Sequence, residues 1–535
     1  MRTLSVAFVS LLGLPLAAQA NAVPGTDIAV FDVNGPGVFG RTGAAYPNGL
    51  VGMAIGHSMC NQGTVNLPWF GTSGGVMVET YPKIAFLLAR ESNGRMVQIS
   101  GKSFLKHSRT AFNFSGTNPC GPCQSGPSQT FRMGCYDVYS SGFNGSQGNL
   151  GPTTEINPWL GSWNPVGSYF DIGDPAQTGY PAAADGVQSL SITGFGSVKN
   201  RMQVLEQDLV TPGTIYGQNQ LVILGEPVAN RGNNQISRPL SFTWSGSSWS
   251  VAVTGTASQG SVLTRWTGAT TAMAGNGNDD GRFLVAVKVT GPVNGMWHYE
   301  YAVQNVDNHR GGAVFRIPVC AEARVENVGF HDIDSDALND WTPVRNGDAL
   351  EFLAGANNPL DWNTFYNVWF DSDAAPAAGL FEVDAARPGA GALTVAVPAQ
   401  VPGLFNVAWL GAGCGAPAPT VVATGQPTIP NAAFGVEFSV TPGNLVIAAF
   451  GFAGANLPLG GGCFQYLDGN QLGVVELLVP NPADGKALRP IPLAAGMTPV
   501  DWFCQGFEVV DGGPLLGFLA PTNGLQLRVG GTGCP

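Results

Sequence analysis

The stretch FLVAVKVTGPVNGMWHYEYAVQNV, residues 283–306, decides the fold class of this chain. Its two apolar halves flank GPVNG at 291–295, and Gly, Pro and Asn are residues that favour turns. The polar residues His298 and Glu300 alternate with large ones, as in a strand with one face in a core, and we expect this polar pair to face solvent. The stretch predicts a β-hairpin with four large side chains on its inner face: Trp297, Tyr299, Tyr301 and Val303.

Other segments repeat this pattern of short strands and turns. Residues 84–100 form two apolar runs around Glu91-Ser92-Asn93-Gly94, and Asn-Gly is a strong hairpin signal. Further short strands are predicted at 27–32, 313–319 and 365–370. Strands therefore recur along most of the chain.

The composition excludes a mainly helical fold. The 535 residues include 75 Gly and 39 Pro, and only 11% are charged, against about 25% in average proteins. Hydrophobic residues still reach 44%, which is enough for more than one core. We predict an all-β chain of multiple β-sandwich-like domains with long disulfide-pinned loops.

The first twenty residues read as a secretory signal peptide. Arg2 precedes an apolar run, and Ala18-Gln19-Ala20 matches a signal-peptidase site. No later apolar run is long enough to span a membrane, so we expect a secreted, extracellular or cell-surface protein. The formal net charge of −12 argues against nucleic acid as a partner.

Changes in composition divide the rest of the chain into three parts. We expect a cysteine-containing, loop-rich β domain at 21–200, a β-sandwich with aromatic hairpins at 201–405, and an accessory β-sandwich at 414–535. Residues 115–165, rich in Gly, Ser, Asn and Pro, are predicted to be a long ordered loop region.

The nine cysteines fall into two groups of four, with Cys320 left over and expected to be unpaired. Export favours disulfides, and each group can pair internally in three ways. For the second group we predict Cys414 with Cys534 and Cys463 with Cys504. The first group consists of Cys60, Cys120, Cys123 and Cys135.

Cys120-Gly121-Pro122-Cys123 spells the thioredoxin active-site tetrapeptide. In that fold the motif begins a helix, whereas Pro119 and the following Gln-Ser-Gly-Pro disfavour a helix here. We therefore favour structural cross-links over a redox site. A zinc site made of the first four cysteines is the third alternative.

A basic cluster of Lys102, Lys106, His107 and Arg109 stands out in this acidic chain. It is either an anion site or, with Asp137 or Glu155 beside His107, a general-base site. The plainer interpretation is a solvated edge strand carrying a hydrogen-bonded core histidine. His57 could join His107 on a metal, although the spacing of the two is not diagnostic.

Asp332, Asp334 and Asp336 alternate along one loop, and clustered carboxylates suit calcium. The EF-hand template fails, because Ala337 and Pro343 occupy its Gly and Glu positions. A solvated acidic loop is the alternative.

Two stretches resemble known sequences. Residues 27–376 resemble a family of secreted bacterial proteins of planctomycete type, which carries no assigned activity. The matching pieces are DIAVFD at 27–32, CNQG at 60–63, SFLKH at 103–107, GCYD at 134–137, LGP at 150–152, WHYEYAV at 297–303 and WNTFYN at 362–367.

The last part, 414–534, looks like a C-terminal β-sandwich module found on many exported proteins of such bacteria. The resemblance lies in ANLPLG at 455–460 and NGLQLRV at 523–529. It implies surface retention or matrix contact rather than chemistry.

The sequence thus favours a secreted or surface-associated binding or structural protein, with polysaccharide as the candidate ligand. Its support is the lack of a common hydrolase motif and the accessory C-terminal module. The competing hypothesis is a secreted enzyme, a hydrolase or a metal-dependent oxidase. Its site would lie near His57, His107, Asp137 and Glu155, and convergence of these four in a cleft would favour it.

Overall fold

The computed structural model describes residues 22–73, 75–101, 103–107, 110–277, 280–321, 323–355, 357–403, 407–425, 427 and 429–530. The expected signal peptide lies outside these residues, as do Lys102 and Arg109. Within the described ranges, no helix has the length and apolar character needed to cross a bilayer. The fold is all-β, as predicted, and the α-helices among the described residues are short: α1 (Ser141–Asn144), α2 (Tyr169–Ile172) and α3 (Glu206–Val210).

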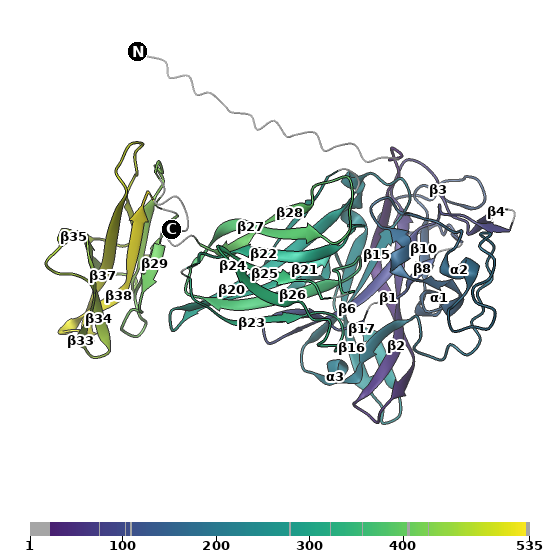
Figure 1. The fold of residues 1–535 in the computed structure, drawn as a ribbon, viewed down its shortest axis with the longest axis horizontal. Helices are drawn as coiled ribbons and strands as arrows, with labels where there is room; N and C mark the ends of the chain where they lie inside the picture. Colours follow the sequence, from purple (N-terminus) through teal and green to yellow (C-terminus); the bar gives the residue numbers. More distant parts are fainter. Residues whose placement is uncertain are drawn as a thin grey trace, which may run out of the picture.

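The N-terminal part packs two sheets around one core (Figure 1). The smaller sheet contains β1 (Ile28–Gly43), β2 (Gly49–Asn61), β10 (Tyr136–Tyr139) and β14 (Met202–Leu205). The larger sheet has the order β11-β8-β6-β15-β16-β17, with β7 on β6 and β18 on β16. Its strands are β6 (Lys83–Ser92), β7 (Arg95–Gln98), β8 (Leu105–His107), β11 (Leu150–Gly151), β15 (Thr214–Val222), β16 (Gln235–Trp244), β17 (Trp249–Val253) and β18 (Ser258–Gln259).

The loop-rich region of this part is ordered by short antiparallel pairs. β3 pairs with β9, β4 with β5 and β12 with β13, and each of these strands has only two residues. Their bounds are β3 (Leu67–Pro68), β4 (Thr72–Ser73), β5 (Val76–Met77), β9 (Thr130–Phe131), β12 (Ile156–Asn157) and β13 (Ser162–Trp163).

The middle part is a sandwich of two five-stranded sheets, in the orders β19-β20-β21-β26-β23 and β24-β25-β22-β27-β28. The first contains β19 (Thr270–Gly275), β20 (Arg282–Val293), β21 (Met296–Asn305), β23 (Val325–His331) and β26 (Phe365–Ser372). The second contains β22 (Gly312–Pro318), β24 (Thr342–Asn346), β25 (Ala349–Leu353), β27 (Pro376–Ala385) and β28 (Thr394–Pro402).

The hairpin predicted at 283–306 forms as β20 and β21, and Asn294 and Gly295 turn it with positive φ angles of 53° and 79°. Tyr299, Tyr301 and Val303 lie in the core between the two sheets. The alternation of large side chains therefore predicted the inner face of this strand.

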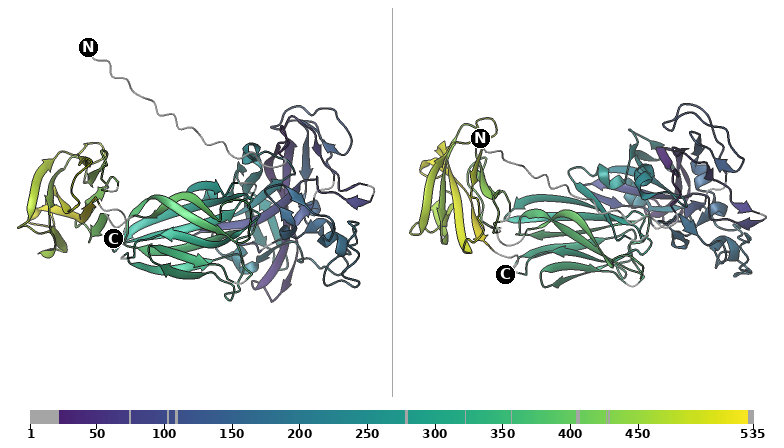
Figure 2. Two further views of the ribbon diagram at one scale, coloured as in Figure 1. Left: turned by 45° about the horizontal axis from the view of Figure 1, so that its top comes forward. Right: turned by 90° about the horizontal axis from the view of Figure 1, so that it is seen from above.

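The C-terminal part is a smaller sandwich at the far end of the molecule (Figure 2). Its sheet β29-β38-β37-β32-β35 contains β29 (Val407–Leu410), β32 (Leu445–Gly451), β35 (Leu472–Leu478), β37 (Val500–Gly513) and β38 (Gly517–Val529). The facing sheet contains β30 (Thr420–Ala423), β31 (Gly435–Ser439) and β36 (Lys486–Pro490), and a hairpin joins β33 (Gly454–Gly460) to β34 (Cys463–Leu467).

The sheets do not divide at residue 200, where we expected a boundary. β14 pairs with β2, and β15 pairs with β6 over nine residue pairs, so the strands up to residue 259 belong with the N-terminal sheets. The first strand of the middle sandwich begins at Thr270, and β29 joins the C-terminal sheet before Cys414. These pairings are long-range, which composition cannot show.

The disulfides correct part of the cysteine prediction. Cys60 binds Cys120 and Cys123 binds Cys135, so the first group pairs within itself. In the second group Cys414 binds Cys463, which excludes both pairs that we predicted there, and Cys504 is a free, buried thiol. Cys534 lies outside the described residues, and Cys320 is disulfide-bonded rather than unpaired.

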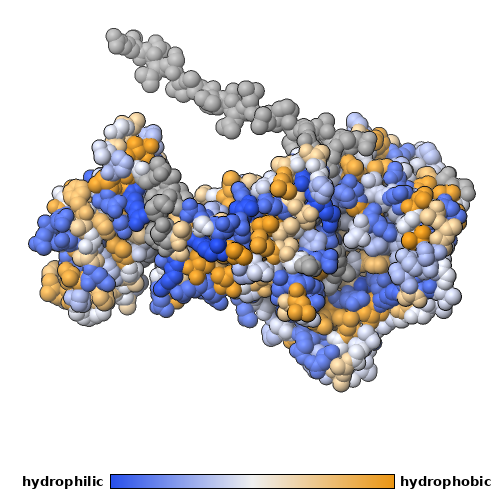
Figure 3. All heavy atoms as spheres, in the orientation of Figure 1, coloured by the Kyte–Doolittle hydropathy of each residue, from blue (hydrophilic) through white to orange (hydrophobic). Residues whose placement is uncertain are grey.

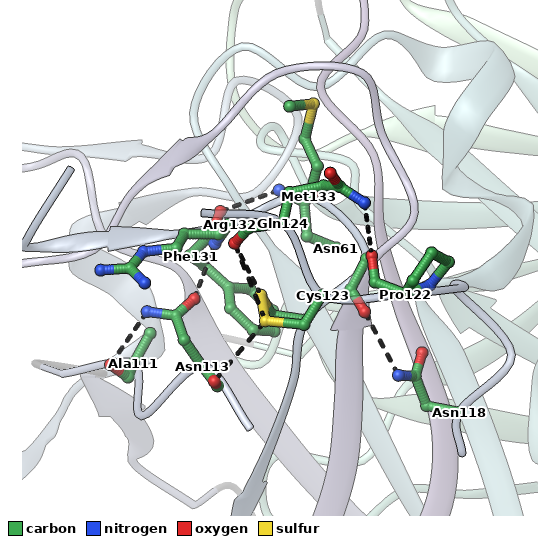
Figure 4. Close-up of a disulfide and its surroundings, with 12 residues drawn as sticks. Asn61, Ala111, Asn113, Asn118, Pro122, Cys123, Gln124, Phe131, Arg132 and Met133 are labelled. Carbon is green, nitrogen blue, oxygen red and sulfur yellow. Dashed lines mark hydrogen bonds between the residues drawn. A yellow bond between two sulfur atoms is a disulfide. The ribbon is translucent and has the colours of Figure 1, made fainter. Parts of the chain in front are cut away.

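The CGPC motif is structural, because its two cysteines bind different partners. Asparagine side chains hold the surrounding loop (Figure 4). Asn113 donates to the Thr130 carbonyl at 2.8 Å and accepts from the Arg132 amide at 2.7 Å, and Asn118 accepts from the Cys120 amide at 2.7 Å. The disulfides use all four thiols that a zinc site would need, so both the redox and the zinc alternatives fail.

Peptide mapping without reduction should recover peptides linking Cys60 to Cys120, Cys123 to Cys135 and Cys414 to Cys463. Because Cys504 is buried, which raises the pKa of its thiol, iodoacetamide should label Cys504 only after unfolding. A peptide linking Cys463 to Cys504 would contradict the observed pairing.

Phe370→Ala should destabilise the middle sandwich by about 3–5 kcal/mol, because Phe370 is fully buried and stacks on Tyr299 with ring centroids 5.1 Å apart. Hydrogen exchange of β21 and β26 measures this effect within one domain. Leu338→Ala is the control, since Leu338 is 95% exposed and should change stability by less than about 0.5 kcal/mol. Equal effects of the two substitutions would refute the proposed packing.

Candidate functional site

Three of the four residues expected near an enzyme site are enclosed in the interior. His57, His107 and Asp137 are each at most 1% exposed, so a substrate could not reach them in this conformation. Glu155 is only partly buried, and it lines a separate hollow together with Glu79 and Trp163. The structure therefore does not present the four side chains together in one cleft.

His57 is held as a neutral core histidine on β2. The Asn144 side chain donates to its Nδ1 at 3.1 Å, and Tyr139 packs edge-on against its ring. Burial, assisted by the nearby Lys106 charge, lowers the pKa of His57 to about 3. An imidazole that stays neutral and enclosed is a poor proton shuttle.

His107 lies on β8, which is an interior strand of its sheet rather than an edge. Aromatic rings from other elements enclose its side chain. Its Nδ1 lies 2.9 Å from the Tyr81 hydroxyl, and the rings of Trp163 and Phe170 approach to centroid distances of 4.6 and 4.7 Å. These contacts agree with the plainer prediction of a hydrogen-bonded core histidine.

The two carboxylates of the predicted enzyme site bind backbone amides. Asp137 accepts from the amides of Phe112 and Val138 at 3.1 and 2.8 Å, and Glu155 accepts from the amide of Tyr169 at 2.7 Å. Burial raises the pKa of Asp137 to about 6 and that of Glu155 to about 7. Both carboxylates thus help to hold the loop region in place.

The acidic loop at 332–336 is arranged as successive turns. Asp332 accepts from the Asp334 amide at 3.0 Å, Asp334 from the Asp336 amide at 2.7 Å, and Asp336 from the Leu338 amide at 3.1 Å. Across the part of the chain that the structure describes, no three His, Cys, Asp or Glu side chains converge as metal ligands would. Calcium binding at this loop, and metal binding by His57, stay predictions.

A polar groove of about 640 Å³ lies where the N-terminal and middle parts meet. We call it the junction groove. The β6–β7 hairpin and the α3 segment form one wall, and β20, β21, β23 and β26 form the other. Its principal side chains are Arg90, Arg95, Lys288, His298, Glu300 and Trp369.

Arg95 and Trp369 form the centre of the junction groove. The Arg95 guanidinium lies 3.7 Å above the Trp369 ring and binds Glu300 through Nε at 2.6 Å. On β23, any Cβ at Gly329 would lie 2.1 Å from the Trp369 ring, so only glycine allows this packing. Gly329 and Arg95 together fix the indole orientation.

His298 continues this network on β21. Its Nδ1 lies 2.6 Å from Asp371 Oδ1, and its Nε2 lies 3.2 Å from Glu300 Oε2. The hydrogen bond to Glu300, with a smaller contribution from the bond to Asp371, raises the pKa of His298 despite its partial burial. Glu300 is only 4% exposed, so our expectation that this pair faces solvent is wrong for Glu300, because the N-terminal hairpin covers that face.

Hydrogen-bond donors dominate the remainder of the groove. Arg90 binds Asp208 at 3.0 Å, whereas Lys288 has no carboxylate partner within 4 Å among the described residues. Burial lowers the pKa of His331, which therefore stays neutral. Cationic and amide donors of this kind can bind hydroxyl and carboxylate oxygens of a ligand.

The sequence did not reveal this site, because Arg95 and Trp369 are far apart along the chain. One local signal was available: Gly329 lies within the strand at 325–331, and a glycine inside a strand often marks a close approach. The aromatic pattern of 365–370 predicted a strand but not which face Trp369 occupies.

Comparison with known proteins adds no functional assignment. No protein-family model and no curated protein sequence matches the chain. Among solved structures, the T6 backbone pilin of serotype M6 Streptococcus pyogenes, described as a modular three-domain structure decorated with variable loops and extensions, is similar. The match covers 86% of this chain and 79% of that chain, with 9% identity and a TM-score of 0.20, which is too low to carry an argument.

Histidine titration by NMR should distinguish His298 in the junction groove from the core histidine His57. His298 should protonate with a midpoint above about 6.5, because two carboxylates stabilise its charge, whereas the His57 signal should not shift until the pH nears 3. The stabilisation from His298 is present below pH ~6.5 and lost as the pH rises through its folded-state pKa.

His298→Gln identifies the His298 signal and should flatten this part of the stability profile. A His298 midpoint at or below about 6.5 would show that the carboxylates do not hold the ring.

Proposed function

We propose that this protein is a secreted or surface-associated binding protein and that its junction groove binds an acidic polysaccharide. The observation that carries the proposal is the concentration of donors in this groove, with Lys288 lacking a carboxylate partner there. The chain as a whole has a net charge of −12, whereas three cationic side chains, Arg90, Arg95 and Lys288, line this one groove. Uronic acid units carry both hydroxyl and carboxylate groups, which these donors can bind.

Preorganisation of the groove also supports binding. Arg95 is held by Glu300 and by Trp369, so its guanidinium loses little conformational entropy when a ligand binds. Lys288 and Arg90 supply further hydrogen-bond donors in the groove besides this rigid centre. A polymer lying along the groove could therefore be bound at several points.

The disulfides support the proposed export of the protein from the cytosol. Three disulfides are formed within the described residues, and disulfides persist in oxidising compartments outside the cytosol. Together with the signal-peptide pattern at 1–20, they favour export.

The proposal predicts that the full chain binds polygalacturonate and not dextran. Lys288→Ala should weaken binding by about tenfold or more, because a hydrogen bond to a charged group contributes about 1.5–3 kcal/mol. Isothermal titration calorimetry at low salt gives both affinities directly.

Lys486→Ala is the matched control, because Lys486 is an exposed lysine paired with Glu437 in the C-terminal part. It should leave the affinity unchanged. Failure of the wild type to bind polygalacturonate, or equal losses in the two variants, would refute the proposal.

A further inference from the structure

The C-terminal sandwich carries a concentration of exposed apolar side chains around strand β35. The strand itself exposes Val475 and Leu477 at 56% and 58%, and Val479 directly after it is 78% exposed. Leu472, Val474, Leu488 and Phe452 are also exposed. We call these seven residues the β35 patch.

The patch residues outside β35 lie on elements that contact this strand. The ring of Phe452 packs directly over Gly473 on β35. Glu476 on β35 binds Arg489 on β36 at 2.5 Å, which joins the two strands, and Leu488, the residue before Arg489, is exposed on the opposite face of β36. Figure 3 shows hydrophobic residues (orange) interspersed with hydrophilic ones (blue) on the face of the C-terminal part that it presents.

β35 is also the edge strand of its sheet, because it pairs only with β32. Its label in Figure 1 lies at the end of the molecule away from the N-terminal sheets. Its outer N–H and C=O groups therefore have no strand partner within the described chain. Soluble proteins usually protect such edges with lysine, proline or short strand length, and this seven-residue strand has neither residue.

The exposed area matches what a stable dimer needs. From their exposed fractions, the seven side chains present on the order of 700 Å² per copy, close to the roughly 800 Å² that each partner buries in a stable interface. These side chains lie on both faces of the edge strand and on neighbouring elements. A second strand paired along this edge would therefore contact side chains on both faces of β35.

We propose that the β35 patch is a homodimer interface in which β35 of one chain pairs antiparallel with β35 of a second copy. Pairing centred on Val475 places Leu472 opposite Leu478 of the other copy. It also places Glu476 opposite Val474, whereas a register centred on Glu476 would oppose two like charges directly. A second copy of this chain offers an equally apolar edge of the same length, and the symmetry closes the interface after two chains.

Sedimentation equilibrium of the full chain tests the proposal. The wild type should have the mass of two chains at micromolar concentration, and Val475→Lys should have the mass of one chain, because a buried lysine would be desolvated at the symmetry axis. Leu393→Lys, at a 59% exposed position in the middle sandwich, is the control and should remain dimeric.

Val475→Cys tests the register. Opposed residues in an antiparallel pair have Cα atoms about 4.5–5.5 Å apart, which suits a disulfide, so this variant should form a cross-linked dimer on oxidation, and Leu393→Cys should not. A monomeric wild type, a dimeric Val475→Lys or an uncross-linked Val475→Cys would overturn the proposal. A monomer that binds phosphatidylcholine vesicles through the same residues would also overturn it and identify a lipid-binding surface instead.

Discussion

The structure depends on a small core shared between its N-terminal and middle parts. Leu87, Met96 and Tyr216 from the first pack against Leu284 and Phe365 from the second. Polar side chains extend the contact: Asn363 donates to the Phe86 carbonyl at 2.7 Å, Asn367 to the Met96 carbonyl at 2.9 Å, and Gln220 to the Val306 carbonyl at 2.6 Å. Separating the two parts would expose this apolar core to water and replace these buried hydrogen bonds by bonds to water.

This shared core explains both the sequence of the central hairpin and the position of the groove. β20 is apolar on both faces because Phe283, Val285 and Val287 face the sandwich interior, while Leu284 and Ala286 face the N-terminal part. The junction groove opens where the second face of β21 emerges from this contact at Glu300 and His298. The segments 297–303 and 362–367 therefore supply groove and interface residues.

Local sequence patterns predicted the strands but not the pairing of strands that are far apart in the chain. Alternation and turn residues identified the hairpins at 84–100 and 283–306, and cysteine counting identified the first disulfide group. The pairing of β15 with β6 joins segments more than a hundred residues apart, and no local pattern records it. The same holds for the contact of Arg95 with Trp369, so the sequence drew attention to the buried His57 and His107 instead.

Because of this shared core, we expect the N-terminal and middle parts to form one cooperative unit and the C-terminal sandwich a second. Native-state hydrogen exchange in increasing denaturant measures the opening free energy of each strand. We expect β6, β15, β20 and β21 to open together, and β32 and β37 to open at a different free energy. Opening of β20 and β21 while β6 and β15 stay protected would show that the shared core does not couple the two parts.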